Sequence, residues 1–121
     1  MARVLIVEDN PANLKLATFI LSHAEHETLC AASGEEGVAI ARRERPDLIL
    51  MDVQMPGISG LEATRQLKQD SRTAAIPIIG LTAFAMKGDA QRILAAGCDA
   101  YLPKPYSHLQ LIAAVSDLLR K

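Results

Sequence analysis

Short apolar segments alternate along this chain with longer segments in which apolar residues recur at helical spacing. Residues 3–7, 47–51 and 76–82 are almost continuous in apolar side chains. Such strands are typical of a parallel sheet with helices on both faces, because a strand with one wet face alternates apolar and polar residues. Helical segments of about 10–15 residues lie between the strands. The predicted strands are residues 3–7, 28–32, 47–51, 76–82 and 100–102.

Helix-capping residues occur where this pattern needs helices to begin. Asn10 precedes Pro11, which suits an N-cap followed by proline at the first helical position. Three serines are each followed three residues later by Glu or Gln, the spacing of a capping box. Gly97 is placed to end the fourth helix. The chain is therefore predicted to be α/β, with a doubly wound parallel sheet. The capping pairs are Ser33 with Glu36, Ser59 with Glu62 and Ser107 with Gln110.

The composition fits one ordinary domain and excludes several classes of partner. With 121 residues, 50% of them hydrophobic, we expect a single domain over residues 1–121 with no output domain. The net charge is −1 and the basic residues are scattered, so no nucleic-acid or membrane-binding surface is expected. The first apolar run is too short for a signal peptide, and no segment has transmembrane length, so the expected location is the cytoplasm. Cys30 and Cys98 are expected to be reduced, partly buried thiols.

Polar and ionisable residues stand at the ends of the predicted strands. Glu8 and Asp9 follow the first strand, and Asp52 follows the third. Thr82 ends the fourth strand, and the fifth leads to Lys104. Because doubly wound folds carry their sites at the carboxyl ends of the strands, these residues are predicted to meet at one edge of the sheet.

The three acids predict a bound divalent cation. Two ionised carboxylates about 4 Å apart repel each other by roughly 4 kcal/mol at an effective dielectric constant near 20. Oxygen ligands without histidine or cysteine favour Mg²⁺ over zinc. One Mg²⁺ and the Lys104 ammonium balance the three negative charges, and the Thr82 hydroxyl adds a hydrogen-bond donor. Such a pocket suits a transferred phosphoryl group.

Four segments carry a family resemblance that covers essentially the whole chain. "VLIVEDN", "LILMDVQMPGISG", "LTA" and "YLPKP" resemble, in order and spacing, the motifs of response-regulator receiver domains of the CheY-like superfamily. The resemblance implies a (βα)5 flavodoxin/CheY-like fold with a five-stranded parallel sheet of order 2-1-3-4-5. "LTAFAMKGD" together with "GCDAYLPKP" is most similar to single-domain regulators of the DivK type. It is also similar to receivers attached to hybrid histidine kinases.

The resemblance assigns a role to each strand-end residue. It implies that Asp52 accepts a phosphoryl group from a phosphohistidine. It also implies that Asp9, Asp52 and the backbone carbonyl of Gln54 bind Mg²⁺, and that Glu8 acts through metal-bound water. Lys104 is implied to pair with Asp52 and afterwards with the phosphate.

A second group of residues is implied to respond to the phosphate. The Thr82 hydroxyl is expected to move toward it, and the orientation of Tyr101 to change as the space behind its ring changes. The Lys104-Pro105 peptide bond is expected to be cis. The switch and partner face comprises Thr82, Ala83, Phe84, Tyr101 and Pro105.

Two side chains are expected to flank the path of water to the phosphate. Gln54 lies two residues beyond the implied phosphoacceptor, and Phe84 lies two residues beyond the implied switch hydroxyl. We hypothesise that the bulk of Phe84 slows hydrolysis of the acyl phosphate by crowding this path.

The implied function is that of a phosphoacceptor in two-component or phosphorelay signalling, not of a turnover enzyme. A sensor histidine kinase, a histidine phosphotransferase or both would donate phosphate, and an allosteric kinase or scaffold is a possible target. A receiver excised from a hybrid histidine kinase is the alternative. A flavodoxin-like electron carrier is disfavoured because Glu8 and Asp9 would repel the FMN phosphate. An aspartate-nucleophile phosphatase is disfavoured because Gln54 stands where a second acid is needed.

Overall fold

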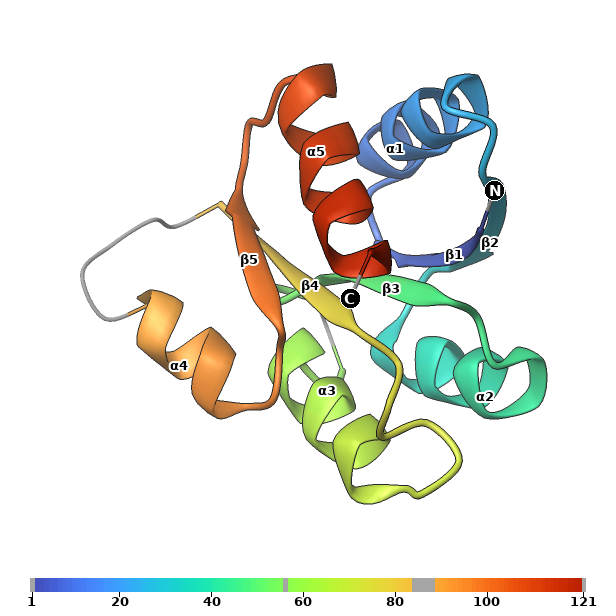
Figure 1. Ribbon diagram of the computed structural model, residues 1–121. Helices are drawn as coiled ribbons and strands as arrows, with labels where there is room; N and C mark the ends of the chain where they lie inside the picture. The colour runs from blue at the N-terminus through green and yellow to red at the C-terminus, as the bar shows by residue number, and fades with distance from the viewer. Residues whose placement is uncertain (1, 56, 84–88, 121) are drawn as a thin grey trace.

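The computed structural model describes residues 2–55, 57–83 and 89–120, in which five strands alternate with five helices (Figure 1). The strand order is β2-β1-β3-β4-β5, which confirms the predicted order. Neighbouring strands are all parallel, so their carboxyl ends share one edge of the sheet. The elements are β1 (Arg3–Val7), α1 (Pro11–His23), β2 (Glu27–Ala31), α2 (Gly34–Glu44), β3 (Leu48–Asp52), α3 (Gly60–Gln69), β4 (Ile78–Thr82), α4 (Asp89–Ala95), β5 (Ala100–Pro103) and α5 (His108–Leu119).

Helices cover both faces of the sheet, with α1 and α5 on one face and α2, α3 and α4 on the other (Figure 1). Successive side chains of β1 alternate between the two cores: Val4 and Ile6 pack toward α1 and α5, whereas Leu5 and Val7 pack toward the opposite helices. Every residue of β3 and β4 is buried. The continuous apolar runs in the sequence therefore reflect burial on both faces, as predicted.

The first strand has its predicted bounds, and the other four differ from the prediction by one or two residues. The largest difference is at β4, which begins at Ile78 rather than at Ile76. The Ile76 N–H donates to the Thr73 carbonyl in the preceding turn, and Pro77 has no N–H to contribute to a sheet. At the other edge, β2 begins one residue early because Glu27 pairs with Arg3.

All four predicted N-caps are present, but the complete capping box forms only once among them. Asn10 Oδ1 accepts hydrogen bonds from the first turn of α1. The Ser107 hydroxyl accepts from Gln110 N–H, and the Gln110 side chain accepts from Ser107 N–H, which is the reciprocal arrangement. At Ser33 the reciprocal bond is missing, because the Glu36 carboxylate accepts from Ala32 N–H instead. At Ser59 only the hydroxyl bond to Glu62 N–H is made.

Both cysteines carry free thiols. Cys98 is buried beside Thr64, and burial raises the pKa of its thiol. Cys30 is exposed on the edge strand β2, so the expectation of partial burial was wrong for it. Among the helices of the described residues, none combines the length and apolar character needed to cross a membrane.

Gly60 allows α3 to begin directly against the end of β3. A Cβ atom at this position would lie 2.7 Å from Val53 Cα and would also meet the Asp52 carbonyl oxygen. Both neighbours are backbone atoms, which cannot rotate away as a flexible side chain could. The absence of a side chain at Gly60 therefore sets how closely this helix approaches the strand end that carries Asp52.

We expect Gly60→Ala to lower the free energy of unfolding by about 1–3 kcal/mol, the usual cost of overpacking. Urea denaturation followed by circular dichroism measures this change. Gln69→Ala, at the exposed last position of the same helix, is the control and should stay within about 0.5 kcal/mol of the wild type. Equal urea midpoints for the wild type and Gly60→Ala would contradict this prediction, because they would show that the backbone shifts to accommodate the added Cβ atom.

Candidate functional site

The ends of β1 and β3 meet around the lysine that follows β5. Lys104 Nζ donates a hydrogen bond to Glu8 Oε1 at 2.8 Å and another to Asp52 Oδ2 at 3.2 Å. The Lys104 backbone N–H donates to the Thr82 carbonyl oxygen at 2.7 Å, which ties this loop to the end of β4. Residues that are up to 96 positions apart in sequence thus form one polar cluster at the carboxyl edge of the sheet.

The two acids that contact Lys104 are almost completely buried, with Glu8 2% and Asp52 3% exposed. Burial, reinforced by the adjacent Asp52 carboxylate, raises the pKa of Glu8 from its ordinary value of 4.5 to about 7. The Lys104 ammonium and the Asn10 N–H, which donates to Glu8 Oε2 at 3.2 Å, oppose this rise.

The acids also keep the lysine charged. Burial acts to lower the pKa of Lys104, but the hydrogen bond to Glu8 and the negative charge of Asp52 outweigh it, so the pKa of Lys104 is raised. The cluster therefore keeps a fixed positive charge beside Asp52.

Asp9 lies at the exposed rim of the same cluster. Carboxylate oxygens of Glu8, Asp9 and Asp52 all lie within 4.8 Å of one another. Two ligands of one Mg²⁺ ion are at most about 4.2 Å apart, because each Mg–O distance is about 2.1 Å. The spacing of the three acids therefore fits a hydrated Mg²⁺ after small side-chain movements.

Gln54 connects two of the loops that surround the cluster. Its backbone N–H donates to Asp52 Oδ1 at 3.0 Å, so each oxygen of the Asp52 carboxylate accepts a hydrogen bond. Its side-chain oxygen accepts from the Ala83 N–H at 3.4 Å. The loop after β3 thus contacts the segment after β4 through one side chain.

The remaining sequence-predicted site residues lie on or beside the last two strands. Thr82 is 2% exposed at the end of β4, and Ala83 follows it at the surface. The Lys104-Pro105 bond is cis, as expected. Tyr101 pairs with Gly80 inside the sheet and is 42% exposed, so it is not among the clustered polar groups. Phe84 lies outside the described residues.

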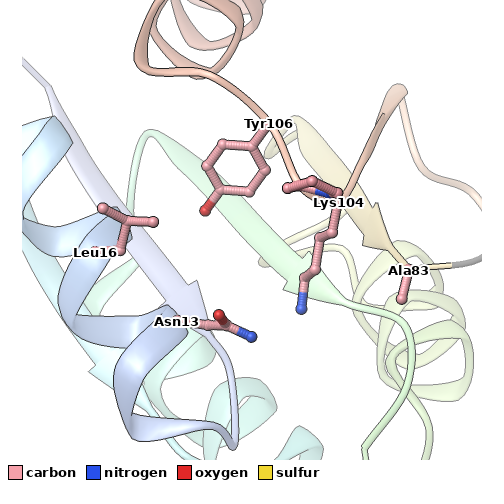
Figure 2. Close-up of a pocket in the computed structure, with 6 residues that line it drawn as sticks. Asn13, Leu16, Ala83, Lys104 and Tyr106 are labelled. Carbon is pink, nitrogen blue, oxygen red and sulfur yellow. The ribbon is translucent and has the colours of Figure 1, made fainter.

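Two residues beside Lys104 were not singled out from the sequence. Asn13, on the first turn of α1, and Tyr106, two residues after Lys104, line a cavity next to it (Figure 2). The position of Tyr106 directly after the Lys104-Pro105 pair was a usable signal for it. No sequence feature indicated Asn13, because only the packing of α1 beside the β5–α5 loop places it next to Lys104.

This buried acid–lysine cluster at the strand ends of a five-stranded α/β sheet is the site of a receiver domain. Residues 4–116 match the response regulator receiver domain family, and the chain belongs to that family. Receiver domains are the phosphoacceptor parts of two-component signalling systems.

Within this family the chain is similar to single-domain regulators. It is 47% identical over 116 residues to the polar-differentiation response regulator DivK of Brucella anthropi, which covers 96% of this chain and 94% of that protein. The match to DivK of Brucella ovis has the same identity and coverage. The expected similarity to DivK-type regulators is confirmed.

Solved structures give the same classification. A response regulator structure from Chloroflexus aurantiacus superposes with a TM-score of 0.95 at 31% identity and covers 99% of this chain and 98% of that one. The receiver domain of a sensor histidine kinase from Pseudomonas aeruginosa superposes with a TM-score of 0.93 at 34% identity and the same coverage. That structure has a magnesium ion coordinated in its active-site cleft.

The raised pKa of Glu8 predicts a pH dependence of folding stability. The folded state binds a proton on Glu8 that the unfolded state releases near pH 4.5, so this contribution is complete below pH 4.5 and is lost as the pH rises through about 7. In EDTA, the wild type should lose about 2–3 kcal/mol relative to Glu8→Gln between these pH values. Urea titrations across the range measure the difference, with Glu25→Gln as the surface control. Parallel pH curves for wild type and Glu8→Gln would contradict the assignment.

Proposed function

We propose that this receiver domain accepts a phosphoryl group on Asp52 from a phosphohistidine of a partner protein. The observation that carries the proposal is the buried Asp52 carboxylate, which lies 3.2 Å from Lys104 Nζ with Asp9 at the open rim. Membership of the receiver family supports the same role. Glu8 shares the burial and both neighbours, and the receiver motif "LILMDVQMPGISG" is what favours Asp52 over Glu8 as the acceptor.

In the proposed transfer, an Asp52 oxygen bonds to phosphorus as the bond from phosphorus to the donor nitrogen breaks. Lys104 stays protonated because its pKa is raised, so its ammonium offsets charge first on the carboxylate and then on the phosphoryl oxygens. The Gln54 N–H, which donates to Asp52 Oδ1, fixes the orientation of the carboxylate. The product is an aspartyl phosphate beside a fixed positive charge.

The cofactor proposed for this site is Mg²⁺. Asp9, Asp52 and the backbone carbonyl of Gln54 would hold it, and Glu8 would contact it through water. When bound, it would neutralise negative charge on the transferred phosphoryl group. The spacing of the three acids supports this set, and a receiver domain of similar structure holds magnesium in its cleft.

We propose that Thr82 and Tyr101 transmit the change to the switch and partner face. A phosphoryl group on Asp52 would carry about two negative charges and three acceptor oxygens, enough to attract the Thr82 hydroxyl. A shift of Thr82 would reach the β5–α5 loop, because the Thr82 carbonyl accepts the Lys104 N–H. Tyr101, on the neighbouring strand, is exposed enough to change its rotamer. Ala83 and Pro105 complete the described part of this face.

The proposed partners follow from the chemistry of the donor. A sensor histidine kinase, a histidine phosphotransferase or both would supply the phosphoryl group, and an allosteric kinase or a scaffold is the proposed target. The proposed setting is the cytoplasm, with no nucleic-acid or membrane partner. We further propose that residues 1–121 act as one signalling domain rather than as a turnover enzyme. The alternative is that the chain is a receiver excised from a hybrid histidine kinase. Its similarity to the receiver domain of a sensor histidine kinase supports this alternative.

We expect acetyl phosphate with Mg²⁺ to add one phosphoryl group to the wild type and none to Asp52→Asn, because the variant lacks the attacking oxygen. Intact-protein mass spectrometry measures the product. Asp117→Asn, an exposed acid on α5, is the control and should be labelled like the wild type. Labelling of Asp52→Asn to the wild-type level would refute the acceptor assignment.

Removal of the metal or of one ligand should slow the same reaction. We expect EDTA to suppress labelling of the wild type. Asp9→Asn should raise the Mg²⁺ concentration needed for half-maximal labelling by about tenfold or more. Mutation of a residue that contacts a bound metal only indirectly already lowers the affinity for the metal by about 10-fold. A Mg²⁺ titration of the labelling rate gives this value. An unchanged titration midpoint in Asp9→Asn would remove this residue from the metal site.

A further inference from the structure

The first turn of α2 contacts the loop that joins β3 to α3. The helices α2 and α3 lie on the same face of the sheet (Figure 1). A Cβ atom at Gly34 would lie 2.7 Å from Ile58 Cγ1 and 2.9 Å from the Ile58 carbonyl oxygen. The start of α2 can therefore approach the loop this closely because Gly34 has no side chain.

Glu35 adds a polar contact at the same place. Its Oε2 accepts a hydrogen bond from the Ile58 N–H at 3.5 Å. The same carboxylate lies against Gly57, where a Cβ atom would be 3.0 Å from Glu35 Oε2. The adjacent acid, Glu36, instead accepts from the Ala32 N–H at the start of its own helix. Glu35 is thus the acid of this turn that reaches the loop.

The loop held in this way carries one of the groups proposed for the metal site. Gln54 supplies the backbone carbonyl proposed to bind Mg²⁺, and its N–H donates to Asp52 Oδ1 at 3.0 Å. At the other end of the loop, Gly60 packs against the Asp52 backbone. Ile58 lies between these two points. Contacts behind a metal ligand fix its orientation, so a contact at Ile58 can affect the affinity for the metal.

We propose that Glu35 is a positioning residue for the metal site: it holds the Ile58 N–H and so keeps the Gln54 carbonyl in place for Mg²⁺. This inference rests on the proposed Mg²⁺ site and adds to it a residue outside the acid–lysine cluster. If the loop were released, only a fraction of the molecules would be ready to bind the ion. The apparent dissociation constant would then rise by the inverse of that fraction.

Two other effects of Glu35 depend on its charge. An acid in the first turn of a helix stabilises the helix through its dipole, and Glu35 stands in the first turn of α2. A carboxylate also attracts cations over a distance of roughly 8 Å at physiological salt. The bond to Ile58 requires only an acceptor oxygen. Glutamine keeps this oxygen without the charge, so Glu35→Gln separates positioning from both effects of charge.

The test is an NMR titration of the full chain with Mg²⁺, at physiological salt and without a phosphodonor. We expect Glu35→Ala to raise the dissociation constant by about two- to fivefold, the effect of one hydrogen bond. Glu35→Gln should remain close to the wild type. In the metal-free protein, the Ile58 amide should exchange with solvent faster in Glu35→Ala than in Glu35→Gln. The control is Asp117→Ala, which removes an exposed acid of α5 and should match the wild type.

Equal dissociation constants for the wild type and Glu35→Ala would overturn the inference. Equal weakening in Glu35→Ala and Glu35→Gln would also overturn it, because the loss of charge would then account for the effect. A wild type that does not bind Mg²⁺ would reject the proposed metal site and this inference with it. Labelling with acetyl phosphate is measured separately. If the wild type binds Mg²⁺ but is not labelled, the acceptor role of Asp52 fails, while weaker binding in Glu35→Ala alone still supports the positioning role.

Discussion

The structure depends on an ammonium group held between two buried carboxylates. Removing Glu8 and Asp52 from water costs several kcal/mol per charge unless each is paired and hydrogen-bonded. Lys104 supplies a donor to both, and backbone N–H groups supply another to each. The fold can therefore keep acids at the buried ends of its central strands, where an apolar interior alone would exclude them.

This balance of charges also supports the proposed reactivity of the site. The lysine compensates only part of the negative charge once Asp9 at the rim is counted, which supports the proposed binding of a cation. Burial, reinforced by the Asp52 carboxylate, raises the pKa of Glu8 to about 7 despite the contact with Lys104. A phosphoryl acceptor needs this state, because a fully neutralised carboxylate is a weaker nucleophile and an unpaired one would destabilise the fold.

Lys104 also links the proposed acceptor, Asp52, to the surface. Its ammonium contacts the buried acids, its backbone N–H is bonded to the end of β4, and its stem lines the cavity beside α1. Gly60 has a comparable role in the backbone, since it lets α3 pack directly against the strand end that carries Asp52. The same few contacts thus set both the packing of the strand ends and the position of the candidate site.

The α/β architecture, the strand order and the four N-caps could be predicted from the sequence, with the order resting also on the family motifs. These features depend on local patterns: continuous apolar runs for strands buried on both faces, and a side-chain oxygen before each helix. The polar residues at the strand ends could be named for the same reason. Parallel strands bring their carboxyl ends to one edge whatever the details of packing.

Only the tertiary structure decided the contacts made by these residues. The family resemblance predicted that Lys104 pairs with Asp52. In the folded chain Lys104 Nζ also lies 2.8 Å from Glu8 Oε1, so Glu8 is a buried member of the cluster. The cavity that joins Asn13 to Tyr106 likewise depends on how α1 lies beside the β5–α5 loop. Strand and helix patterns repeat over a few residues and can be read locally. Distances between side chains almost a hundred positions apart are set by the packing of the whole domain.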